Sequence, residues 1–150
     1  MSPLELGVLI FVVLALPFAI IVAILLWLRR NVHQTQDAIA NRFPTAVKII
    51  PSASFFGQES KGVMQMRGTG TLVLTTTSLY FQKWVVGTEY TINLSQIRAI
   101  ETPTSFLGKT QFKPLLKLVY QTDSGQQDAM AWLVPDFEEL KKMIEDRIQL

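Results

Sequence analysis

The 150-residue sequence contains no cysteine and a single histidine, His33. Without cysteine the chain cannot form disulfides, thiolate zinc sites, iron–sulfur clusters or a cysteine nucleophile. One histidine cannot supply the paired imidazoles of an HExxH site or of another multi-histidine metal site. These absences remove much of hydrolase and metalloenzyme chemistry. We therefore expect a protein without a cofactor.

Charge is also absent from a long stretch, because residues 6–28 include no Asp, Glu, Lys or Arg. At about 1.5 Å per residue a helix of this length reaches roughly 34 Å, slightly more than the ~30 Å hydrocarbon core of a bilayer. The stretch is apolar on every side, unlike an amphipathic soluble helix. Trp27 stands where an interfacial anchor belongs, and Arg29 and Arg30 follow it. The sequence therefore predicts a transmembrane helix over residues 6–28.

A cleaved signal peptide is the alternative interpretation of this stretch. Residues 38–40, Ala-Ile-Ala, match the small-x-small cleavage pattern. However, the residues before the apolar stretch include Glu5 and no basic residue. The stretch is also longer than the roughly 7–15 apolar residues of a signal peptide. These features favour the transmembrane helix.

Basic residues are concentrated on the C-terminal side of the apolar stretch. Arg29, Arg30, Arg42 and Lys48 lie there, whereas the N-terminal flank offers Glu5 and the free amine. Basic flanks stay in the cytoplasm. We therefore expect a single-pass membrane protein with its N-terminus outside and its C-terminal domain in the cytoplasm.

Ala15, Ala19 and Ala23 recur at every fourth position of the apolar stretch and so share one helix face. Small residues at this spacing allow a second helix to pack closely. The alternative is that alanine is simply common in such helices. If the face is used, the chain is an accessory structural subunit of a larger membrane complex.

Residues 29–45 are mostly polar, and we interpret them as a juxtamembrane linker or a helical continuation that ends before Pro44. From about residue 46 the apolar residues alternate with period two, which is typical of half-buried strands. The predicted strands are 69–75, 79–85, 88–94, 97–102, 115–122 and 127–134. The last segment changes to helical period, with Phe137, Leu140 and Ile144 on one face.

Three short patterns in this order resemble the GRAM and bacterial PH-like domains. They are Gly-Thr-Leu-Val-Leu-Thr at 70–75, Leu-Tyr-Phe at 79–81 and Ile-Asn-Leu-Ser-Gln-Ile at 92–97. The resemblance covers residues 46–150. It implies an antiparallel β-barrel or sandwich with a C-terminal capping helix. It also implies a lipid- or protein-binding module and not an enzyme, so we expect a membrane-anchored, non-catalytic interaction surface on the cytoplasmic face.

The middle of the chain is basic and its end is acidic. Residues 57–117 contain seven Lys or Arg against three acids, and residues 118–150 contain seven acids against three bases. This split differs from the strongly basic surface of a nucleic-acid-binding protein, so we expect no nucleic-acid partner. The expected partners are the bilayer, anionic lipid headgroups or a protein.

One loop in the basic half combines apolar and basic residues. These residues are Phe106, Leu107, Lys109, Phe112 and Lys113. Aromatics beside lysines suit contact with an anionic membrane surface, where each nearby Lys contributes about 1 kcal/mol. The alternative is that the aromatics pack onto the core while the lysines are solvated.

Overall fold

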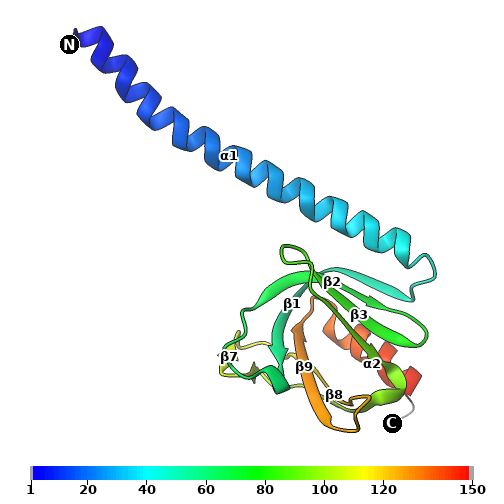
Figure 1. The fold of residues 1–150 in the computed structure, drawn as a ribbon. Coiled ribbons are helices and arrows are strands. Elements are labelled where there is room, and N and C mark those ends of the chain that lie inside the picture. Colours follow the sequence, from blue (N-terminus) through cyan, green and yellow to red (C-terminus); the bar gives the residue numbers. More distant parts are fainter. Residues whose placement is uncertain (1, 149–150) are drawn as a thin grey trace. The chain divides into compact units, whose positions relative to one another are not determined.

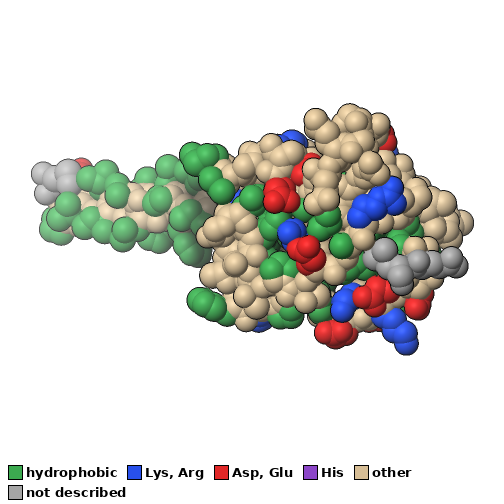
Figure 2. All heavy atoms as spheres, turned by 90° about the horizontal axis from the view of Figure 1, so that it is seen from below, with side chains coloured by type: hydrophobic (Ala, Val, Ile, Leu, Met, Phe, Trp, Pro, Cys, Tyr) green, Lys and Arg blue, Asp and Glu red, His purple; other side chains and the backbone are tan. Residues whose placement is uncertain are grey.

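The computed structural model describes residues 2–148, and it divides at Thr35 and Gln36 into two compact units (Figure 1). The first unit is the N-terminal part of helix α1 (Pro3–Arg42), which has Pro17 in its interior. This helix is long and apolar enough to cross a membrane, and none of its most apolar 18-residue window is buried. Hydrophobic side chains cover its visible face (Figure 2). Ala19 and Ala23 are exposed on it and Ala15 is half-exposed.

Residues 29–42 continue the same helix through the segment interpreted as a linker. The second unit begins within this helix, at Gln36. Ile39 is 2% exposed and packs with Val73 and Tyr80 in a small apolar cluster. The β domain therefore starts about two turns before the helix ends, because this last part of the helix supplies apolar cover to the sheet.

The second unit is built on a seven-stranded antiparallel sheet with the order β4-β3-β2-β1-β9-β8-β5. Its strands are β1 (Lys48–Gln58), β2 (Gly68–Leu74), β3 (Ser78–Lys83), β4 (Glu89–Asn93), β5 (Ile97–Glu101), β8 (Leu116–Gln121) and β9 (Gln127–Leu133). A two-stranded hairpin, β6 (Ser105–Phe106) with β7 (Lys109–Thr110), lies between β5 and β8 in the sequence. Helix α2 (Phe137–Ile148) follows β9. The predicted antiparallel sheet and C-terminal helix are confirmed.

The expected barrel or sandwich does not take the form of a closed barrel within residues 2–148, because the edge strands β4 and β5 do not pair with each other. Between them the chain forms a 3-10 turn, Leu94–Gln96, with a capping box in which Asn93 and Gln96 bond each other's backbone. The turn redirects the chain out of the β4 ladder before β5 begins. Helix α2 contacts this turn and β5, and its Leu140 and Ile144 are fully buried. The helix therefore covers the opening that a barrel would close with strand pairing.

The main core lies on the inner face of the sheet and beneath α2. Its centre is aromatic, with the ring centroid of Trp132 5.6 Å from that of Phe55 and 6.0 Å from that of Phe81. Aromatic pairs at such distances contribute beyond their buried area. The buried residues of this core are Ile50, Ala53, Phe55, Leu72, Leu74, Leu79, Phe81, Ile92, Leu94, Ile97, Leu116, Leu118, Tyr120, Met130, Trp132, Val134, Leu140 and Ile144.

Two smaller clusters cover the outer face of the sheet. The end of α1 covers β2 and β3 through Ile39, Val73 and Tyr80. The chain around β6 covers β1, β8 and β9 through a second cluster. This second cluster is formed by Phe56, Phe106, Leu115, Val119, Ala129 and Ala131. Both faces of the central strands are therefore buried, which explains the uninterrupted apolar residues 72–74 of β2 and 129–133 of β9.

We expect Ile39→Ala to lower the free energy of unfolding of a fragment that begins at Gln36 by about 2–5 kcal/mol, the usual cost of removing a buried large aliphatic side chain. Urea unfolding followed by circular dichroism measures this difference. The matched control is Val63→Ala, which truncates an exposed side chain. Equal stability of the two variants would show that the end of α1 is not part of the core.

Candidate functional site

The structure separates the five residues of the 103–114 loop into two groups. Phe106 is 7% exposed and belongs to the outer cluster that contains Phe56 and Leu115. Leu107 is half-buried and lies against Gly57, where an added Cβ would come within 2.7 Å of the Leu107 side chain. Gly57 also has φ +139°, a region that favours glycine. The absence of a side chain at residue 57 lets the β6–β7 hairpin lie directly on β1.

Lys109 is half-buried and belongs to the same group. Its amine donates hydrogen bonds to the backbone carbonyls of Phe56, at 3.2 Å, and Gln65, at 2.5 Å. These bonds join the β6–β7 hairpin to β1 and to the β1–β2 loop. Lys109 thus has a structural role that the sequence pattern does not reveal.

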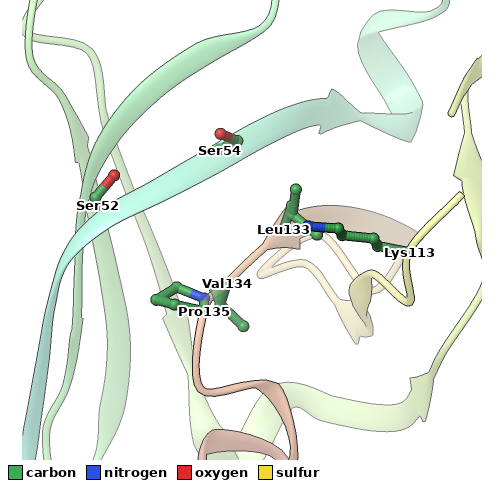
Figure 3. A pocket seen from close by; sticks show the side chains of 6 residues that line it. All are labelled: Ser52, Ser54, Lys113, Leu133, Val134 and Pro135. Carbon is green, nitrogen blue, oxygen red and sulfur yellow. The ribbon is translucent and has the colours of Figure 1, made fainter. Parts of the chain in front are cut away.

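Phe112 and Lys113 form the second group, and both side chains are exposed. The exposed fraction of Phe112 is 90%. Lys113 lines an open hollow of about 370 Å³ together with Ser52, Ser54 and Leu133 (Figure 3). The hollow forms where β1 and β9 diverge, beyond their first paired residues, Ser54 and Leu133. One cation and two surface hydroxyls give a ligand few fixed partners here.

A more distinctive surface lies at the end of the sheet where the β1–β2 loop (59–67) meets the β3–β4 turn (84–88), and we name it the loop-end surface. It exposes five large apolar side chains, those of Val63, Met64, Met66, Val85 and Val86. Met66, Val85 and Val86 line one groove of about 280 Å³, together with Arg67 and Lys83. The two loops are therefore neighbours and expose their apolar residues at one end of the domain.

Four cations lie at this surface. The Lys61 amine is 5.1 Å from the centre of the Tyr90 ring, and the Lys83 amine lies over the same ring at 6.0 Å and over Phe55 at 5.0 Å. The Arg67 guanidinium lies 4.2 Å above the Phe56 ring. Lys109 is the fourth cation. Burial lowers the pKa of Lys83, and the positive charges of Lys61 and Lys109 lower this pKa further.

The four cations of the loop-end surface outnumber the one acid of its two loops, the exposed Glu59. Within residues 2–148, no ion pair involves Lys61, Arg67, Lys83 or Lys109. The nearby acid Glu89 is paired with Arg42 at 3.1 Å. The surface therefore combines exposed apolar side chains with repelling cations, and an anionic partner would relieve this repulsion.

A buried carboxylate holds the β1–β2 loop in place. Asp128 is almost fully buried in β9 and accepts hydrogen bonds from Gln58 Nε2 at 2.6 Å, Tyr120 OH at 3.1 Å and both the backbone N–H and the hydroxyl of Ser60. Burial alone would raise the pKa of Asp128, but the hydrogen bonds from Gln58 and Ser60 bring this pKa below its usual value. The carboxylate is therefore ionised at neutral pH and has a structural role.

Gln65 anchors the middle of the same loop. Its side-chain amide donates to the carbonyls of Gln58, at 2.5 Å, and Gly62, at 2.6 Å, and its side-chain oxygen accepts from the Gln58 backbone N–H. Together with the bond from Lys109 to the Gln65 carbonyl, four hydrogen bonds hold this residue. The exposed Met64 and Met66 therefore lie on either side of the hydrogen-bonded Gln65.

Comparisons with known proteins indicate the fold alone. No protein-family model matches the chain, and no curated protein matches its sequence. A solved structure, described as the C-terminal domain of an unknown protein from Leishmania infantum, is similar with a TM-score of 0.54 and 13% identity. The match covers 76% of this chain and 97% of that one. The β domain therefore shares its fold with a protein of very different sequence.

Sequence reasoning missed the loop-end surface because its apolar residues have no periodicity. Val63, Met64 and Met66 occur in an irregular segment, Val85 is the last residue of the predicted strand 79–85, and Val86 directly follows it. The excess of basic residues in 57–117 was the available signal. It indicated the charge of the surface but not its position.

The two phenylalanines of the 103–114 loop are expected to behave differently. Phe106→Ala should lower the free energy of unfolding by about 3–5 kcal/mol, the usual cost of truncating a buried aromatic. Phe112→Ala should change it by less than about 0.5 kcal/mol, as exposed substitutions do. Thermal and urea unfolding of the 36–150 fragment measure both variants. Equal destabilisation by the two substitutions would contradict this placement of the loop.

Proposed function

We propose that this chain is a membrane-anchored, non-catalytic interaction module whose loop-end surface binds anionic lipid headgroups. The observation that carries the proposal is the combination of Val63, Met64, Met66, Val85 and Val86 with cations that lack acidic partners. Apolar residues that enter the interface and basic residues that attract anionic lipid are the two components of peripheral membrane binding.

The transmembrane span of the proposal is supported by the exposed apolar helix and by Arg29 and Arg30 after it. The PH-like assignment is supported by the strand order, by the helix after the last strand and by the three short patterns in residues 70–97. The PH-like domain gives rigid support to its loops, since both faces of the central strands are packed. We propose no catalytic role. The buried carboxylate of Asp128 accepts hydrogen bonds from Ser60 of the β1–β2 loop and so has a structural role.

A bilayer suits the loop-end surface better than a protein partner does. The exposed apolar residues are methionines and valines on two loops, and no aromatic residue is among them. Protein interfaces are enriched in aromatic anchors at their centres. Each basic residue near an anionic membrane contributes about 1 kcal/mol. The transmembrane helix would also keep the β domain near the bilayer, so the loop-end surface would meet lipid headgroups at a high effective concentration.

The same proposal places the β domain in the cytoplasm, because Arg29, Arg30, Arg42 and Lys48 follow the apolar stretch. A reporter that is active only in the cytoplasm, fused to the C-terminus, should therefore work. A fusion with an export-dependent reporter should be inactive. The opposite pattern of activities would exclude this orientation.

The binding proposal is tested with the full chain in neutral-lipid nanodiscs. Because the chain has no cysteine, Val86→Cys permits a single environment-sensitive label at the loop-end surface. We expect a blue shift when vesicles containing anionic lipid are added, or when anionic lipid is built into the nanodisc itself. Lys61→Gln with Arg67→Gln should weaken the binding roughly 30-fold, since two basic residues together contribute about 2 kcal/mol.

Two controls accompany this experiment. A label at Thr76→Cys, on the exposed β2–β3 turn, should show no shift. Lys141→Gln with Lys142→Gln removes the same charge from α2 and should leave the binding unchanged. A protein rather than a lipid partner would be indicated if vesicles of every composition left the Val86 label unaffected while native membrane extract shifted it.

A further inference from the structure

We propose that Met64 and Met66 are a peroxide-sensitive modification site, at which oxidation to methionine sulfoxide releases the loop-end surface from the membrane. This inference rests on the proposed membrane binding and adds a means of regulating it. The proposal concerns two sulfur atoms whose surroundings differ from those of the other described methionines.

The exposure of the sulfur-containing residues differs sharply along the chain. Met64 is 91% exposed and Met66 is 82% exposed, whereas Met130 is 4% exposed in the main core and Met143 is half-buried against it. The chain has no cysteine, so no thiol competes for an oxidant. Oxidation of methionine follows exposure. The reactive sulfur of the β domain is therefore concentrated in the β1–β2 loop.

The position of both methionines follows from the residue between them. Gln65 points toward the domain, where its side chain is bonded to Gln58 and Gly62. On either side of it, the side chains of Met64 and Met66 are 91% and 82% exposed. The neighbours on either side of Gln65 are therefore directed away from the domain together, toward the medium or a bilayer. Asp128 adds to this arrangement by holding Ser60 at the start of the loop.

The chemistry is a two-electron oxygen transfer. Hydrogen peroxide gives one oxygen atom to the thioether sulfur as its O–O bond breaks, so the sulfur is oxidised to the sulfoxide and the peroxide is reduced to water. The sulfoxide is polar and no longer favours the apolar side of the interface. A methionine sulfoxide reductase with a thiol reductant returns the oxygen as water and restores the thioether. The fold should tolerate the change, because neither side chain is buried.

The full chain in neutral nanodiscs tests this inference with hydrogen peroxide as the oxidant. Site-resolved mass spectrometry should find Met64 and Met66 oxidised at least about tenfold faster than Met130, in line with their exposure. Binding to vesicles containing anionic lipid, read from the Val86 label, should then weaken roughly tenfold, since a polar group replaces apolar contact. Treatment with the reductase should restore the binding. Vesicles present before the peroxide should slow oxidation of both methionines.

Substitutions separate this effect from general damage. Met64→Leu with Met66→Leu should bind vesicles equally well before and after peroxide, whereas Met143→Leu should remain as sensitive as the unmodified chain. A circular dichroism melting curve checks that peroxide leaves the fold intact. Binding that persists after complete oxidation of both sulfurs would overturn this inference and leave the proposed function standing. Absence of vesicle binding before any peroxide is added would overturn both.

Discussion

The burial of both faces of β1 organises the β domain. At consecutive positions of this strand, Phe55 is fully buried in the main core and Phe56 is fully buried on the opposite face. A strand with two apolar faces needs a second cover in addition to the core. The β6–β7 hairpin provides this cover over Phe56, and the end of α1 covers the neighbouring strands β2 and β3. Helix α2 completes the inner side.

This arrangement also bears on the loop-end surface. Its two loops leave strands that are packed on both sides, and the β1–β2 loop is hydrogen-bonded through Asp128, Gln65 and Lys109. The apolar side chains of both loops are nevertheless exposed. Their exposure is the basis of the proposed membrane contact and of the proposed oxidation site. In the proposed function, the hydrogen-bonded residues position the β1–β2 loop, and the exposed residues set the affinity for the membrane.

Much of the fold could be predicted from local pattern. The strand from Glu89 to Asn93 and helix α2 were predicted because alternation and helical period each place apolar residues on one side. Strand β1 was not bounded in advance, since Pro51 and Gly57 interrupt its pattern at two bulges. The sequence did not decide between a barrel and a sandwich, because closure depends on how the two edges of the sheet meet. The local patterns of β4 and β5 do not show whether these two edge strands pair.

The sequence by itself determined the long apolar helix, the antiparallel strands, the C-terminal helix and the basic character of the middle of the chain. These features depend on neighbouring residues and on composition, and both can be read from the sequence alone. Only the tertiary structure decided that Phe106 and Lys109 are structural and that Phe112 is exposed. It also brought Met66 beside Val85 and Val86. The physical reason is that burial and charge neutralisation are set by residues far apart in the chain, which only the folded sheet brings together.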